Sequence, residues 1–169
     1  MSNFEHPKAG GPGVISIGSS DDTSLTVEAQ YNPKELQIDK SVPWQKNPQS
    51  NKAPDKGIQL EFTGAEGRSM SVELLFDGYE TGGGLVLGSI QALETLASVI
   101  DPSSSDENRR RPHLCVVTWG AGGMPSFRCV IESLSTKYTM FSSEGAVLRA
   151  TCTVKLKEAD VVSMKSGGK

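Results

Sequence analysis

The chain has 169 residues, a net charge of −3, 36% hydrophobic residues and 22% charged residues, and it is rich in Gly and Pro. This is the size of one ordinary globular domain, which can bury a core without disulfides or a structural metal. The negative charge argues against a nucleic-acid partner, because phosphate binding depends on Lys and Arg that displace counterions.

A basic run and the cysteines need separate interpretation. Arg109, Arg110 and Arg111 follow a polar stretch, so we interpret them as part of a solvated loop that balances its own acids, not a nucleic-acid patch. Cys129 and Cys152 fall at inward positions of predicted strands, which predicts buried thiols instead of bridges or ligands. No signal-peptide pattern or bilayer-length apolar run is present, so we expect synthesis and assembly in the cytoplasm and no membrane insertion.

The first third of the chain divides into an arm and two short strands. Residues 1–23 are dense in Gly, Pro and Ser, which predicts a flexible N-terminal arm. Period-2 alternation over residues 25–31 predicts a strand, Asn32-Pro33 predicts a turn, and residues 36–38 predict the returning strand. We therefore expect one β domain over residues 24–160, followed by a short C-terminal tail at 161–169.

A long unpatterned segment follows. Residues 41–56 hold three prolines and no periodicity, which predicts a loop of functional length. Trp44 lies in this polar segment without a local core, so it either folds back onto its own sheet or docks on a partner. Beyond the loop, alternation over residues 58–62 and 70–76 predicts two strands that form a hairpin around the turn at 64–67.

One helix interrupts the strands. After the three glycines at 82–84, apolar residues recur from Ile90 to Ile100 at the spacing of an amphipathic helix, and Asp101-Pro102 ends it. Strands are then predicted at residues 112–120, 127–134, 138–141 and 145–156. The last shows the clearest alternation, with inward positions Leu148, Ala150, Cys152, Val154 and Leu156.

The order of strands, one helix and more strands contains no repeated βαβ unit. It predicts a mainly β (α+β) fold of two packed antiparallel sheets, a barrel-like sandwich with one flanking helix. Packing the helix over a sheet lets both elements bury their apolar faces.

No catalytic, cofactor or metal site is predicted. His6 and His113 lack the partners of a Ser-His-Asp hydrolase or a zinc site. The glycines at 82–84 lack the Gly-Lys-Ser/Thr end of a phosphate loop, so we interpret them as a flexible connection. A small β-barrel enzyme is therefore the weakest function class.

The combined motifs resemble a known family. They are YNPKEL at residues 31–36, LLFDGY at 74–79, the Pro-x6-Trp-Gly ending at 112–120, and the pattern of Phe, Ile, Tyr, Gly and Arg over 127–150. In order and spacing they resemble the inner-tube and tube-adaptor proteins of contractile injection systems, which are phage-tail-like particles. The resemblance covers about residues 25–158.

This resemblance implies six-membered rings that stack into a hollow tube, with other tube, baseplate or spike, and sheath proteins as partners. Longer adaptor relatives carry a C-terminal LysM-like module, whereas this chain ends at residues 161–169. Head-to-tail pairing of open strand edges would give such rings a mechanism. Candidate interface residues are Pro43, Trp44, Gln45, Lys46, Tyr138, Phe141 and Arg149. The alternative from another class is a monomeric β-sandwich that binds carbohydrate or peptide through exposed aromatic residues.

Overall fold

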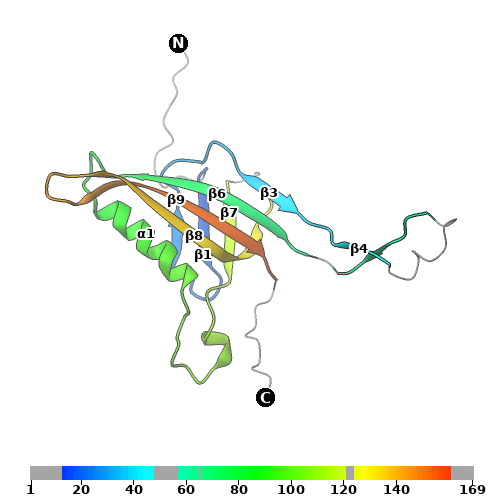
Figure 1. The fold of residues 1–169 in the computed structure, drawn as a ribbon. Coiled ribbons are helices and arrows are strands. Elements are labelled where there is room, and N and C mark those ends of the chain that lie inside the picture. The colour runs from blue at the N-terminus through cyan, green and yellow to red at the C-terminus, as the bar shows by residue number, and fades with distance from the viewer. Residues whose placement is uncertain (1–12, 48–56, 65, 121–123, 161–169) are drawn as a thin grey trace, which may run out of the picture.

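The structure is a computed structural model that describes residues 13–47, 57–64, 66–120 and 124–160. It contains a seven-stranded sheet in the order β2-β1-β7-β8-β9-β6-β3 and a two-stranded sheet, β4-β5 (Figure 1). All strand pairs are antiparallel. The strands are Ile15–Ser19 (β1), Thr26–Glu28 (β2), Gln37–Lys40 (β3), Trp44–Lys46 (β4), Leu60–Phe62 (β5), Arg68–Asp77 (β6), Cys115–Trp119 (β7), Phe127–Phe141 (β8) and Val147–Glu158 (β9).

The long strands β6, β8 and β9 form the centre of the domain. On β9, Ala150, Cys152, Val154 and Leu156 are fully buried, and the intervening residues point to the opposite, wetter face. The register sets Leu74 of β6 against Cys152, so the buried sides of the two strands coincide. The predicted alternation of the last strand is thus confirmed from Ala150 to Leu156, whereas Leu148 is only partly buried and Val147 packs on the core instead. Burying each large aliphatic side chain contributes about 1.5–3 kcal/mol.

Helix α1, Gly84–Ala97, covers the buried face of this sheet (Figure 1). Val86, Ile90, Leu93 and Leu96 enter the core, at the spacing expected of an amphipathic helix. The helix ends at Ser98, which is extended, so Ile100 lies beyond it and its N–H donates to the carbonyl of Arg111. The predicted helix is confirmed, with its end a few residues earlier. A second short helix, the 3-10 turn η2 at Glu107–Arg109, lies in the loop that follows.

The predicted fold class is confirmed: the chain is mainly β, with two antiparallel sheets and one flanking helix. Strands β1, β2 and β7 share one core with β6, β9 and α1, which gives the domain its layered character. Within the described residues the sheet does not close into a barrel. The two-stranded sheet extends away from the domain as an arm (Figure 1).

The boundary of the predicted N-terminal arm differs from the structure. Residues 15–19 of that arm form β1, which pairs with β2 on one side and β7 on the other. Ile15 and Ile17 are each only 1% exposed. The short apolar patch at residues 14–17 therefore outweighs the Gly- and Pro-rich composition around it. Residues 1–12 and the tail at 161–169 lie outside the described residues.

The predicted neighbours of four strands are wrong. Strands β2 and β3 do not return on one another but lie at opposite edges of the large sheet. Strand β5 pairs with β4, and β6 pairs with β3 and β9, so no hairpin spans residues 64–67. Local turn signals locate chain reversals, whereas strand partners are decided by contacts distant in sequence.

Two segment predictions also change. The predicted loop at 41–56 contains β4, although residues 48–56 lie outside the described part. The two strands predicted over 127–134 and 138–141 are one strand, β8, of 15 residues. The pairing of β8 with β9 is regular from Ser133 to Tyr138, so the polar residues between the two predicted strands continue one strand; register irregularities occur on either side, between Ile131 and Ser133 and near Met140.

Candidate functional site

Strands β4 and β5 form a two-stranded ribbon, named here the ribbon, which carries four of the seven predicted interface residues. Trp44 pairs with Phe62, Gln45 with Glu61 and Lys46 with Leu60. Pro43 continues the pairing, because its carbonyl accepts the N–H of Thr63 at 3.2 Å. The ribbon therefore has regular backbone pairing over its described length, and Pro43, Trp44, Gln45 and Lys46 belong to one structural unit.

The two faces of the ribbon differ in polarity. Gln45, Glu61 and Asn47 point to one side, where Asn47 Nδ2 donates to Glu61 Oε1 at 2.5 Å. The other side carries Lys46 and is otherwise apolar and exposed. Trp44 is 56% and Phe62 53% exposed, and their rings contact each other with centroids 5.6 Å apart. We call this apolar side the ribbon face; it comprises Val42, Trp44, Ile58, Leu60 and Phe62.

The ribbon face answers the question that the sequence leaves open for Trp44. The indole does not fold back into the core of its own sheet, since the side chain remains half exposed beside Phe62. A lone exposed apolar residue needs no explanation, but a contiguous group on a projecting element marks an interaction surface.

The ribbon is anchored where it joins β6. Arg68 donates to both carboxylate oxygens of Glu158, from Nη2 at 2.9 Å and from Nε at 3.2 Å, and its backbone N–H adds a bond of 2.7 Å. The Arg68 guanidinium also lies over the ring of Phe127, 5.3 Å from its centroid. Hydrogen bonds from Arg68 lower the pKa of Glu158 to about 2. This contact fixes the start of β6 to the end of β9.

The other three predicted interface residues lie at the opposite end of the domain, by the turn between β8 and β9 (Figure 1). Phe141 is 56% exposed, and Tyr138 is also exposed. Arg149 donates to Asp77 Oδ2 from Nη2 at 2.8 Å and from Nε at 3.1 Å, so it holds β9 to β6. The pKa of Asp77 is lowered, first by the backbone N–H of Tyr79 and then by Arg149.

Further exposed apolar side chains gather at this end. The start of α1 lies here, since its N-cap residue Gly83 packs against Val147. The chain before the helix is also held here, because Gly78 N–H donates to the carbonyl of Leu148 at 2.7 Å. Gly83 approaches the carbonyl of Val147 so closely that a Cβ would clash with it, so this glycine allows close packing and is more than a flexible link. We call Tyr79, Leu87, Tyr138 and Phe141 the hairpin-end patch, whereas Leu85 lies on the other flank of α1, beside Thr26–Glu28 of β2.

The structure therefore divides the predicted interface residues between two ends of one subunit. Of thirteen large apolar residues that are exposed in the described part of the chain, five form the ribbon face and four the hairpin-end patch. Every aromatic residue in this exposed group belongs to one of the two surfaces. The aromatic residues do not line a common cleft, as they would in a carbohydrate-binding module.

Sequence reasoning expects open strand edges without identifying the strands, and in the described residues two such edges border the group β8-β9-β6-β3. Strand β3 is paired only with β6, and it ends the large sheet. Strand β7 pairs with β8 only over residues 127–129, so β8 beyond Cys129 has β9 as its only described partner strand. Free edges offer backbone donors and acceptors to another strand. The unusual length of β8 is the signal that could have indicated one of them.

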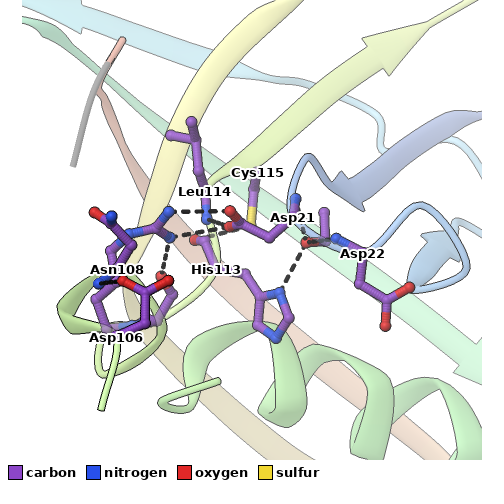
Figure 2. Close-up of polar contacts among 10 residues, drawn as sticks. Asp21, Asp22, Asp106, Asn108, His113, Leu114 and Cys115 are labelled. Atoms are coloured by element: carbon purple, nitrogen blue, oxygen red, sulfur yellow. Dashed lines mark hydrogen bonds and ion pairs between the residues drawn. The ribbon is translucent and has the colours of Figure 1, made fainter. Parts of the chain in front are cut away.

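A polar cluster on the other layer acts within the subunit. Asp21 accepts from both Nη atoms of Arg111 at 3.0 Å and from the N–H of Leu114 at 2.9 Å (Figure 2). These hydrogen bonds, chiefly those from Arg111, lower the pKa of Asp21. His113 Nδ1 lies 2.7 Å from the hydroxyl of Ser19, and both residues are buried. The cluster joins the loop after α1 to the end of β1.

This geometry bears on the basic run and on the cysteines. Arg111 is paired with Asp21 and Arg110 with Glu107, so at least two of the three arginines form ion pairs with acids of the same region.

Cys115, Cys129 and Cys152 are free and buried, as predicted for the last two. Burial raises the pKa of Cys115 to about 11 and of Cys129 to about 12, which keeps both thiols protonated.

Two features are absent from the described residues. They contain no group of three or more His, Cys, Asp or Glu placed to hold a metal ion. Within the same residues, no helix has the length and apolar character needed to cross a bilayer. His6 lies outside the part of the chain that the structure describes.

Comparison with known proteins gives one match. A family model described as contractile injection system tube protein matches residues 16–165, which is most of the chain. The match begins at the second residue of β1 and includes every later element of the domain. No individual curated protein matches the sequence.

Proposed function

Because the chain belongs to the contractile injection system tube protein family, we propose that it is a structural subunit of the inner tube, or of its baseplate-proximal adaptor layer. Six copies form a ring, and rings stack into a hollow conduit. The role is structural, not catalytic. Assembly takes place in the cytoplasm, and the partners are other tube, baseplate or spike, and sheath proteins of the same particle.

The observation that carries this proposal is a pair of free strand edges. One is the outer edge of β3, and the other is the edge of β8 beyond Cys129, on the opposite side of the group β8-β9-β6-β3. Neighbouring strands in this group are antiparallel, and their number is even. A copy related by rotation therefore presents its β8 antiparallel to β3 of the first copy, which continues the alternation. A head-to-tail contact of this kind forms a closed ring when repeated rotation brings the last copy against the first.

The polarity of the sheet supports a hollow ring. One face of these strands carries the core and α1. The other carries hydroxyl and charged side chains in register, with Ser133 opposite Lys155, Ser135 opposite Thr153 and Lys137 opposite Thr151. In a closed ring this polar face lines the lumen, where it remains hydrated, while the helix-covered side faces outward.

Proline substitutions on β3 test the ring contact. Successive N–H groups along a strand point to opposite sides, so Asp39→Pro and Lys40→Pro each remove a donor, one toward β6 and one toward the free edge. We expect the variant that loses the outward donor to remain folded by circular dichroism and to lose ring formation in negative-stain images. A proposal of edge pairing fails if both variants stay folded and form rings in wild-type yield.

A further inference from the structure

We infer that residues 1–12, named here the leading segment, dock in a groove on the polar side of their own β6. There they add a short strand to a gap in the edge of β6 and place Phe4 on Leu75. The docking goes beyond the proposed tube function and does not depend on it. If the ring also forms as proposed, this side of the sheet lines the lumen, and each docked segment becomes part of the lumen wall.

The outer edge of β6, on the side away from β9, is paired at its two ends. The N–H of Gly78 donates to β9, so the N–H groups of the odd-numbered residues of β6 point toward the outer edge. Of these residues, Ser69 and Ser71 lie opposite β3. At the other end the side-chain amide of Gln30 takes the place of a strand, because it donates to the carbonyl of Asp77 and accepts its N–H, each at 2.7 Å.

Between these two ends the edge has a gap at Glu73 and Leu75. Strand β3 begins at Gln37, so neither residue has a partner strand on this side within the described part of the chain. If β3 were continued in register, Pro33 would lie opposite Leu75, and a proline has no N–H to donate. The N–H and C=O groups of both residues are therefore open to another segment of extended chain.

A groove lies against this gap. It has a volume of about 600 Å³, and its lining includes Glu73, Leu75 and Thr151 of the sheet and the connection at residues 31–35. Leu75 is 38% exposed, and it is the one apolar residue among the five outward-pointing residues of β6. The groove thus offers open backbone groups beside a single apolar side chain, which suits an extended peptide that carries one large apolar residue.

The described chain begins beside this groove. Asn32, which lines the groove, donates from Nδ2 to the carbonyl of Gly13 at 2.8 Å, and its Oδ1 accepts the N–H of Ile15 at 3.1 Å. The connection to the leading segment is therefore fixed at the rim of the groove. Twelve extended residues span about 40 Å, which is ample for the return. Such a tether gives the segment a high effective concentration at the groove, which favours it over a separate molecule.

The composition of the leading segment matches the groove. Phe4 is its only aromatic residue, and residues 2–6 contain neither Gly nor Pro, so each of their N–H groups can join a strand. Lys8 follows, and Glu73 in the groove is exposed and belongs to no ion pair among the described residues. An aromatic contact with Leu75 and a lysine near Glu73 complement the lining of the groove.

Site-resolved amide hydrogen exchange on the full-length protein tests the docking. We expect the N–H of Leu75 to be protected in the wild type, and Phe4→Asp to speed its exchange by roughly tenfold or more. Ala9→Asp is the matched control, because it adds the same charge to the leading segment outside residues 2–6, and it should leave the exchange of Leu75 unchanged. The N–H of Asp77, held by Gln30, is the internal reference and should exchange alike in all three proteins. An unprotected Leu75 in the wild type, or protection that survives Phe4→Asp, overturns the inference.

A disulfide test identifies whose segment occupies the groove. Facing residues of a strand pair have Cα atoms about 5.5 Å apart, which a disulfide can span. Phe4→Cys with Leu75→Cys, oxidised under native conditions, should therefore form a cross-link, and the three native thiols are buried and do not compete. In a mixture of ¹⁵N-labelled and unlabelled subunits, mass spectrometry should find the two peptides linked within one chain. Links between labelled and unlabelled chains would place the segment on a neighbouring copy, and the absence of a cross-link would place it elsewhere; either result overturns the inference.

These readouts separate the docking from the proposed function, because neither requires rings. If the docking fails, the ring proposal stands, since it depends on the edges of β3 and β8. If no rings form, the docking is still decided by the same two measurements, and only its place in a lumen wall is lost.

Discussion

The ribbon and the helix-backed sheet share one sequence pattern and differ in what covers their apolar side. On β9 the alternating residues Ala150, Cys152, Val154 and Leu156 are completely buried under α1 and the β1 layer. On the ribbon, Leu60 and Phe62 alternate in the same way, yet each is about half exposed. Alternation therefore reveals that one side of a strand is apolar, but not which element buries it.

This difference separates folding from assembly. The buried sheet supplies the hydrophobic free energy that folds the subunit, whereas the ribbon has no such role within the described residues. A contiguous exposed apolar surface on a projecting element is typical of an interaction surface. Substitutions should therefore affect the free energy of unfolding in one region and the association of subunits in the other.

The largest expected effect is in the buried sheet. Phe76→Ala removes a side chain that is 1% exposed, and it should lower the free energy of unfolding by about 3–5 kcal/mol because a cavity remains. Phe62→Ala is the matched ribbon variant and should lower it by about 1 kcal/mol or less, the value of a cross-strand pair. Urea unfolding at concentrations where single subunits predominate measures both. Equal losses would mean that the ribbon belongs to the folding core.

A smaller effect is expected at the hairpin end. Gly83→Ala introduces a Cβ against the backbone carbonyl of Val147, which should lower the free energy of unfolding by about 1–3 kcal/mol. Gly88→Ala is the control, because a Cβ there meets nothing within 4 Å and alanine favours a helix by about 1 kcal/mol. In thermal unfolding, the midpoint should fall for Gly83→Ala and rise for Gly88→Ala. A neutral Gly83→Ala would show that the start of α1 is not tightly packed against β9.

The smallest effect concerns acid and the anchor of the ribbon. The folded-state pKa of Glu158 is lowered to about 2 from 4.5, so its stabilising contribution is complete above the unfolded value and is lost as the pH falls from about 4.5 toward 2. Asp21 and Asp77 shift in the same direction. Glu158→Gln should flatten the fall of the unfolding midpoint in this window, whereas the exposed control Glu35→Gln should leave it unchanged. If Glu158→Gln leaves the pH dependence of the unfolding midpoint unchanged, Glu158 does not stabilise the folded state in this pH range.

The elements that the sequence predicts well are those decided by neighbouring residues. The spacing of Ile90, Leu93 and Leu96 indicates α1, and the alternation from Ala150 to Leu156 indicates β9, because both patterns arise within one segment. The composition around β1 hid a core strand, since Gly and Pro near Ile15 and Ile17 dominate the local signal. A short strand such as β1 is hard to predict because the strands that bury it are distant in sequence, so the local pattern does not show its burial.

The candidate site was predicted in part. Trp44 was identified because an indole in a polar segment needs an explanation, and Tyr138 and Phe141 were identified through the family resemblance. Their separation to two ends of the subunit depends on the pairing of β8 with β9 and of β4 with β5, which no local pattern determines. The free edge of β3 was missed for the same reason: an edge is defined by the partner that a strand lacks.

The most direct test of the central claim is the mass of the purified full-length protein, measured by mass photometry and checked by negative-stain electron microscopy. The account predicts rings of about 108 kDa, which is six copies of 18.0 kDa, and stacks of such rings. A single species of 18.0 kDa at every concentration, with no rings in the images, would contradict it.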